Sequence, residues 1–155
     1  MSRDTLLWIV AGLLIIAGLG TGAYIMARGI RNNNPGNIRH GSSQWLGMST
    51  VQSDDEYVQF DDAVYGIRAM AKLLQNYASR YRLNTIAEII DRWAPPNENI
   101  THKYIEHVAQ IVGASPDQEI DLDAAMLPLV KAIITHENGY NPYTDAQINA
   151  GIQLV

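Results

Sequence analysis

The chain has 155 residues, of which 47% are apolar and 17% charged, and it contains no cysteine. This length permits one domain of ordinary size, and the apolar fraction excludes a wholly disordered chain. The lack of cysteine excludes disulfides, thiolate metal sites and a cysteine nucleophile. The formal net charge of -5 argues against a phosphate-binding surface, so no nucleic-acid partner is expected.

The chain begins with a long uncharged segment. Residues 6–26 are 21 consecutive positions without a charge, and as a helix rising about 1.5 Å per residue they match a hydrocarbon core of about 30 Å. A cleaved signal peptide is the alternative, but the leader has only Arg3, offset by Asp4, and no small-x-small cleavage site. We therefore expect a transmembrane anchor at residues 1–27, in contact with a lipid membrane through residues 6–26, and a folded domain at residues 28–155.

Gly18 and Gly22 form a small-xxx-small pair within this segment that can seat a second membrane helix. A second membrane-spanning protein is therefore a candidate partner. Arg28 and Arg31 follow the span, and this slight positive-inside bias favours a cytoplasmic domain.

No helical period is present in residues 28–60, where Asn, Gly and Ser interrupt short runs such as 44–46 and 57–60. This pattern predicts a loop and a small, irregular β-hairpin.

Helices are predicted from here on. Asp61 or Asp62 can cap the first, whose apolar positions recur every three or four residues: Ala63, Ile67, Met70, Leu74, Tyr77 and Tyr81. Thr85 and Glu88 form a capping-box pattern that opens a short helix ending at Trp93, before two prolines.

Three more helices complete the predicted domain. The first spans about residues 101–112 and is expected to bury Tyr104, Ile105, Val108 and Ile111. The next spans about residues 121–138 and stops at Gly139, with Pro128 implying a kink or a late start. Thr144 and Gln147 form a capping box that begins the last helix. The predicted fold class is α+β and mostly helical.

Glu137 lies on an apolar stripe. Val130 and Ile134 precede it by seven and three residues, so its side chain continues the buried face of the helix. It also lies in the last turn, where unpaired carbonyls carry partial negative charge. Both effects oppose ionisation, so we expect a raised pKa and an acid able to donate a proton near neutral pH. The alternative is a solvated residue at a fraying helix end.

Amides and aromatic rings surround this acid in residues 136–143, and further amides occur in residues 32–37, followed by Trp45. Rings that stack on sugar C–H surfaces and amides that bind hydroxyl groups are typical of sugar sites. The alternative is that the Asn-Pro-Gly run only forms a turn, since these residues are common in turns. Three adjacent asparagines are more than a turn requires.

Four segments carry a resemblance to a known family. They read RGIRNNNPGNIR at 28–39, YVQFDDAVYGIRAMAKLL at 57–74, WAPPNENITHKY at 93–104 and IITHENGYNPYTDAQINAGI at 133–152. They resemble phage and prophage proteins known as virion structural proteins or lysozyme-like lytic transglycosylases. The resemblance covers nearly all of the domain and implies a lysozyme-like α+β fold. In lysozyme-like enzymes the Asn-rich turn follows the helix that ends in glutamate, whereas here it comes first, so the implied arrangement is circularly permuted.

The resemblance implies cleavage of peptidoglycan glycan strands during phage entry or lysis. The candidate catalytic residue is Glu137. The candidate substrate-binding residues are Asn34, Asn37, Trp45, Tyr104, Asn138, Tyr140 and Tyr143.

A competing acid is Glu98, in the loop after two prolines, although it could instead cap the helix at Thr101. A glycoside hydrolase usually needs a second carboxylate about 5 to 9.5 Å from the first. The candidates are Asp54, Asp55, Glu56, Asp61 and Asp62. A lytic transglycosylase needs only one, since the same group can act as acid and then as base.

No metal or cofactor is expected. Asp117, Glu119, Asp121 and Asp123 alternate like calcium ligands, but the EF-hand glycine and distal glutamate are missing, and the histidines include no HExxH pattern.

The sequence thus favours a membrane-anchored enzyme that cleaves peptidoglycan by lytic transglycosylase or muramidase chemistry. The expected location is a single-pass position in a virion or bacterial inner membrane. The catalytic domain would then face the cell wall, against the slight charge bias. The alternative is a non-enzymatic virion membrane protein with a glycan-binding module. A helical adaptor that binds a protein partner is a weaker alternative.

Overall fold

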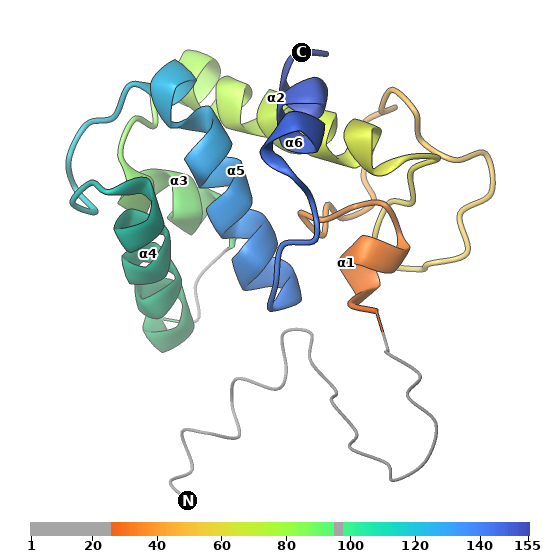
Figure 1. Cartoon of the computed structure of the whole chain (residues 1–155), viewed down its shortest axis with the longest axis horizontal. Coiled ribbons are helices and arrows are strands. Elements are labelled where there is room, and N and C mark those ends of the chain that lie inside the picture. Colours follow the sequence, from red (N-terminus) through yellow and green to blue (C-terminus); the bar gives the residue numbers. More distant parts are fainter. Residues whose placement is uncertain (1–25, 95–97) are drawn as a thin grey trace, which may run out of the picture.

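The computed structural model describes residues 26–94 and 98–155, with only the backbone for residues 98–100. This part of the chain forms six helices (Figure 1): α1 (Arg28–Arg31), α2 (Ala63–Tyr81), α3 (Ile86–Trp93), α4 (Glu98–Val112), α5 (Leu122–Asn138) and α6 (Asp145–Ile152). Nearly all of the predicted anchor at residues 6–26 lies outside the described residues. Within them, no helix has both the length and the hydropathy needed to cross a bilayer.

Helix α5 is the centre of the fold. It runs between α4 on one side and α1 on the other (Figure 1), and α2 and α6 also pack on it. Its buried side chains include Leu129 and Ile133, both fully enclosed. Asp121 caps its start, and Gly139 ends it in the left-handed conformation at φ 78°. The helix continues through Pro128, so the predicted late start is wrong.

The predicted caps of α2 and α3 are confirmed. Asp62 accepts a hydrogen bond from the backbone N–H of Val64, and Thr85 and Glu88 form both bonds of a capping box. Such caps satisfy N–H groups that have no partner within the helix. Tyr81, at the end of the predicted apolar stripe, is exposed instead. It lies in the last turn of α2, where the Arg92 guanidinium stacks 4.6 Å from the centre of its ring.

Helix α4 begins at Glu98, three residues before the predicted start. Tyr104, Ile105 and Val108 are buried as predicted, but Ile111 is 41% exposed and its predicted burial is wrong. The helical repeat explains the difference, because four residues after Val108 the buried stripe continues at Val112, which packs against the core instead.

The predicted hairpin is also wrong. Residues 38–60 form only isolated bridges, between Arg39 and Tyr57 and between Met48 and Phe60. A buried asparagine supplements this limited pairing, because the Asn34 amide donates to the carbonyls of Ile38 and Val58 and accepts from the N–H of Ile38. The bonds to the Val58 carbonyl and from the Ile38 N–H satisfy buried backbone groups that the isolated bridges do not pair.

Ala27, directly before α1, is part of the folded domain. Ala27, at the end of the predicted anchor, is already buried, and its carbonyl accepts a hydrogen bond from the N–H of Arg31 in α1.

Candidate active site

The asparagine-rich turn, residues 32–37, is fixed between α2 and the end of α5. A methyl group added at Gly66 of α2 would lie 2.0 Å from the carbonyl oxygen of Asn33, so glycine permits this backbone contact. From α5, the Asn138 amide donates to the carbonyl of Pro35 at 2.7 Å and to that of Ile134 at 2.9 Å. The turn and the end of α5 are therefore held together.

Asn33 and Asn37 adopt left-handed backbone conformations, with φ of 52° and 49°. Asparagine tolerates this region better than most residues. The conformation of Asn37 accompanies a side chain that reaches the end of α5, about a hundred positions later in the sequence.

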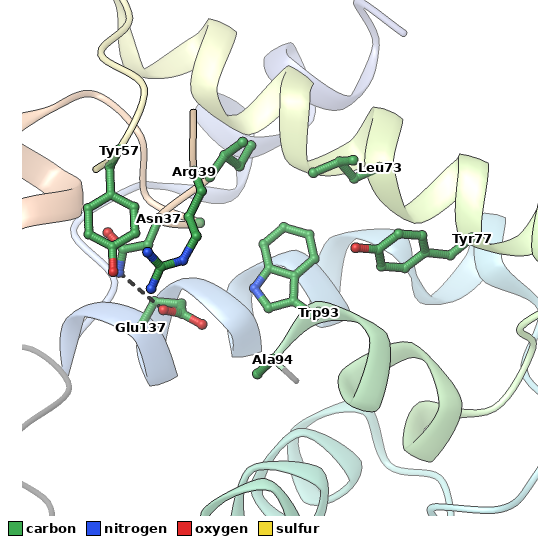
Figure 2. Close-up of a pocket in the computed structure, with 10 residues that line it drawn as sticks. Asn37, Arg39, Tyr57, Leu73, Tyr77, Trp93, Ala94 and Glu137 are labelled. Atoms are coloured by element: carbon green, nitrogen blue, oxygen red, sulfur yellow. Dashed lines mark hydrogen bonds between the residues drawn. The ribbon is translucent and has the colours of Figure 1, made fainter. Parts of the chain in front are cut away.

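A pocket of about 460 Å³ opens beside this junction (Figure 2). Its volume falls within the range of about 300 to 1,000 Å³ that is usual for small-ligand sites. It is lined by Gly36, Asn37, Ile38, Arg39, Tyr57, Leu73, Tyr77, Trp93, Ala94 and Glu137. Three aromatic rings, an amide, a guanidinium and a carboxyl group thus share one cavity.

Glu137 is the acid of this pocket. The Tyr104 hydroxyl donates to its Oε1 at 3.0 Å, and the Asn37 amide donates to its Oε2 at 3.1 Å. Figure 2 also shows the Trp93 indole turned toward this carboxyl group, whose pKa it lowers. Among residues with described side chains, Glu137 is the only carboxylic acid that lines the pocket.

Burial raises the pKa of Glu137 above its ordinary value. The hydrogen bonds from Asn37 and Tyr104, the Trp93 indole and the positive charge of Arg39 act in the opposite direction without cancelling the effect of burial. The predicted direction of the shift is confirmed. An acid in this position retains its proton to a higher pH than a solvated glutamate does.

Tyr104 is held by a stacked histidine. Its ring lies parallel to that of His136, with centroids 3.5 Å apart and 9° between the planes. Burial and the neighbouring His107 lower the pKa of His136 to about 4, so at neutral pH its imidazole adds no positive charge beside Glu137.

The predicted site residues fall into three groups. Asn37 and Tyr104 contact Glu137 directly. Asn34 and Asn138 are fully buried and bind backbone carbonyls, so they shape the site from beneath. The remaining three do not line the pocket: Trp45 and Tyr143 are half-buried against the core, and Tyr140 is 43% exposed. For the alternative acid Glu98, only the backbone at the start of α4 is described.

Four charged or aromatic pocket residues were not predicted as site residues: Arg39, Tyr57, Tyr77 and Trp93. Trp93 had a usable signal, because it is an aromatic residue at a helix end directly before the loop of the alternative acid. Tyr77 was assigned to the buried stripe of α2, and nothing in its spacing distinguishes a residue that lines a cavity from one in the core.

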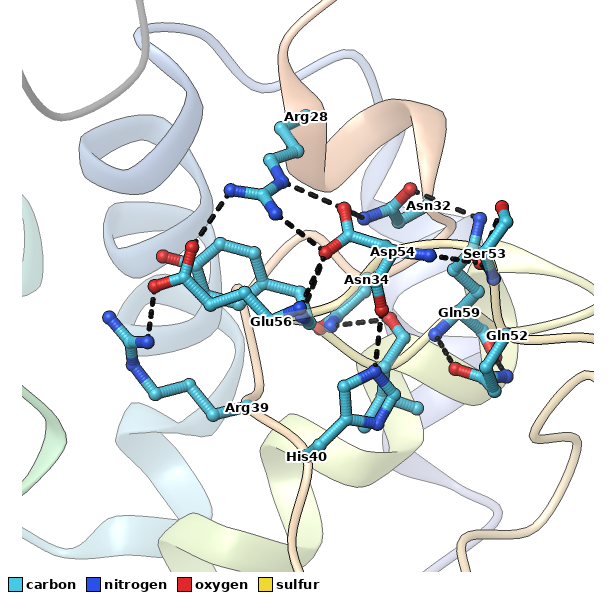
Figure 3. Close-up of polar contacts among 12 residues, drawn as sticks. Arg28, Asn32, Asn34, Arg39, His40, Gln52, Ser53, Asp54, Glu56 and Gln59 are labelled. Atoms are coloured by element: carbon cyan, nitrogen blue, oxygen red, sulfur yellow. Dashed lines mark hydrogen bonds and ion pairs between the residues drawn. The ribbon is translucent and has the colours of Figure 1, made fainter.

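The proposed second carboxylates have other roles. Two hydrogen bonds of 2.7 Å join Arg28 to Asp54, and Asn32 donates to the same carboxylate (Figure 3). These bonds hold the pKa of Asp54 far below its ordinary value. Glu56 pairs with Arg28 at 2.9 Å and also with Arg39. In the described part of the chain, none of the five candidates lines the pocket.

Replacing Tyr104 by phenylalanine is expected to raise the pKa of Glu137 further. The lost hydrogen bond stabilises the charged carboxylate, so its removal favours the protonated form. Above the pKa of Glu137 the variant should also lose about 1–3 kcal/mol of unfolding free energy. Carbon-13 NMR of the Glu137 carboxyl group would measure the shift. Tyr81→Phe, in an exposed tyrosine outside the pocket, serves as the control, and an unshifted titration in Tyr104→Phe would contradict the assigned hydrogen bond.

A scan against protein-family models found no match. The chain is 39% identical over 156 aligned positions to Protein P5 of Pseudoalteromonas phage PM2. The alignment covers 99% of this chain and 97% of that protein, so it includes the pocket and nearly all of the N-terminal segment. The chain therefore belongs to the family of phage PM2 Protein P5, a family of phage proteins.

Proposed function

We propose that this protein cleaves the glycan strand of peptidoglycan, with Glu137 as the single catalytic acid, during phage entry or lysis. The main support for this proposal is the buried carboxyl group of Glu137, whose pKa is raised. Among residues with described side chains it is the only acid that lines the pocket, which also contains aromatic rings and an amide. Membership of the family of phage PM2 Protein P5 supports a role in phage infection. The lysozyme-like fold remains part of the proposal.

The chemistry proceeds in two steps. Glu137 first transfers its proton to the glycosidic oxygen, and the bond from that oxygen to the anomeric carbon breaks, which leaves a cationic sugar. The carboxylate then accepts the proton of the same sugar's 6-hydroxyl group, whose oxygen bonds to the anomeric carbon and closes an anhydro ring. If water takes the place of this hydroxyl group, the reaction is muramidase hydrolysis. Either route returns Glu137 to its protonated form.

The neighbours of Glu137 suit both steps. The Asn37 amide faces Glu137 with its NH2 group and the Trp93 indole has only an N–H donor, so neither of these nitrogens accepts the catalytic proton. They also stabilise the carboxylate that remains after the proton has left. Tyr57, Tyr77 and Trp93 offer ring faces on which sugars can stack.

Anchoring through residues 6–26 is part of the proposal. The domain would then lie on the wall-facing side of a virion or bacterial inner membrane, with other virion membrane proteins as neighbours. Protease digestion of sealed vesicles tests this orientation, because cleavage of the domain from the cytoplasmic face would contradict it.

The decisive experiment is product analysis. Purified cell walls are incubated with the full-length protein in mild detergent, and the released fragments are identified by mass spectrometry. We expect new anhydro ends from transglycosylase chemistry or new reducing ends from hydrolysis, and neither with Glu137→Gln. Binding to walls without new ends would instead identify the alternative, a non-enzymatic virion membrane protein with a glycan-binding module.

A further inference from the structure

We infer that Arg39 binds a carboxylate carried by the glycan strand, so that the pocket selects charged wall glycan over neutral sugar chains. This inference rests on the proposed glycan substrate. Arg39 was not among the predicted site residues, and three features of its surroundings support this role.

The first feature is the position of Arg39. It lines the same pocket as Glu137, and Figure 2 shows its guanidinium beside Asn37 and Tyr57 and turned toward the acid. The side chain is 67% exposed, so a strand entering the pocket can reach it. The guanidinium is held from one side by the Tyr57 ring, whose centre lies 5.1 Å away.

The second feature is unused hydrogen-bonding capacity. A guanidinium has five N–H donors, and in the described part of the chain the Arg39 side chain makes one hydrogen bond, from Nη1 to Glu56. By contrast, Arg28 uses Nε, Nη1 and Nη2 on Asp54 and Glu56 (Figure 3). Two nitrogens of Arg39 thus remain for a ligand, and the guanidinium fork suits a carboxylate in particular.

The third feature is that Glu56 keeps a partner if Arg39 turns to a ligand. Arg28 pairs with Glu56 at 2.9 Å and also stacks on the same Tyr57 ring, at 4.6 Å. When Arg39 moves from Glu56 to a ligand, Glu56 therefore keeps its ion pair with Arg28. Ligand binding then does not have to offset the free-energy cost of an unpaired carboxylate.

A bound carboxylate would also act on the catalytic acid. The positive charge of Arg39 lowers the pKa of Glu137. A substrate carboxylate paired with Arg39 offsets that charge and helps Glu137 keep its proton until cleavage. A charged strand would thus be both bound better and cleaved better than a neutral one.

Two groups on the strand share this chemistry, the lactyl carboxylate of a bare strand and the carboxylates of its peptide stems. The test uses the full-length protein in detergent with three strands: one with stems, one stripped of stems by an amidase, and the stripped strand with its carboxylates converted to neutral amides. Binding is measured in the Glu137→Gln variant, which is not expected to cleave the strand. The affinity can then be determined whether or not the wild-type protein is an enzyme.

With Arg39 present, amidation is expected to weaken binding about tenfold, the usual scale of a hydrogen bond to a charged group. Adding Arg39→Gln should weaken binding to the charged strand by a similar factor and remove the difference between the charged and amidated strands. Arg39→Lys should restore part of the difference between the charged and amidated strands. Lysine returns the positive charge but lacks the paired N–H donors of the guanidinium. A larger effect on the stripped strand would identify the lactyl group, and an effect confined to the strand with stems would identify the peptide.

Arg92→Gln is the matched control. Arg92 is another exposed arginine, and it stacks 6.0 Å from the ring of the pocket residue Tyr77 without lining the pocket. It should preserve the tenfold discrimination. Equal losses on all three strands with Arg39→Gln, or no loss on any of them, would overturn the inference. If the wild-type protein releases no new ends while discrimination persists, the proposed enzymatic function fails and the carboxylate site stands.

Discussion

Replacing Glu137 by glutamine is expected to slow the release of wall fragments by about 10²- to 10⁴-fold, the usual contribution of a general acid. Glutamine keeps the shape of the side chain: its single oxygen can accept the hydrogen bond from Asn37, and its NH2 group can donate to the Tyr104 hydroxyl oxygen. It lacks the proton that the leaving oxygen requires. The rate is measured as loss of turbidity of purified walls. In the wild-type protein the rate should fall as pH rises through the pKa of Glu137.

The same substitution should not harm folding. Because the pKa of Glu137 is raised in the folded protein, its contribution to stability is fully present below the unfolded-state pKa and is lost as pH rises through the folded-state pKa. Glu137→Gln removes this loss. The variant should be at least as stable as the wild-type protein at pH 8, and the difference should shrink toward pH 4, as followed by thermal unfolding.

Glu98→Gln is the control for this experiment, because Glu98 is the alternative acid. Purified walls incubated with this variant should lose turbidity at the wild-type rate. Retained activity in Glu137→Gln together with lost activity in Glu98→Gln would transfer the catalytic role to Glu98.

Replacing Gly66 by alanine is expected to cost about 3 kcal/mol of unfolding free energy and to abolish activity. In most helices this change is favourable by about 1 kcal/mol. Here the added methyl group would lie 2.0 Å from the carbonyl oxygen of Asn33, a backbone atom that cannot move without shifting the turn. The turn carries Asn37, so its displacement also breaks the contact with Glu137.

Thermal unfolding measures the stability change, which corresponds to a fall in Tm of about 6 to 12 °C for a domain of this size. Gly41→Ala is the matched control, because a methyl group there meets nothing within 4 Å. It should leave the unfolding free energy within about 0.5 kcal/mol of the wild-type value. A mild effect of Gly66→Ala would mean that the turn is loosely held and does not fix Asn37.

Local signals predicted the helices well. Capping is decided within four residues, which is why the starts of α2, α3 and α6 follow from Asp62, Thr85 and Thr144. The irregular segment after α1 was harder, since its backbone groups are satisfied partly by isolated pairing, such as Val58 N–H to the Ile38 carbonyl, and partly by the buried Asn34 amide. Composition cannot tell which of three adjacent asparagines bonds to the backbone of Ile38 and Val58.

The site was predictable only in part. The apolar stripe indicated that Glu137 turns inward, and its raised pKa follows from that burial. The partners of the acid depend on contacts between distant segments, since Asn37 lies one hundred positions earlier in the chain. Arg39 reaches the pocket beside Tyr57, its partner in an isolated bridge, and a bridge of this kind has no periodicity to read.

The burial of Ala27 limits where the protein can work. If residues 6–26 span a bilayer, no spacer separates the lipid from the folded domain, and Asn37 follows Ala27 by only ten residues. At about 3.6 Å per residue, even a fully stretched chain of this length covers about 36 Å. With such an anchor, the pocket lies within a few nanometres of the lipid headgroups, so the proposed cleavage would act only on strands that come this close to the bilayer.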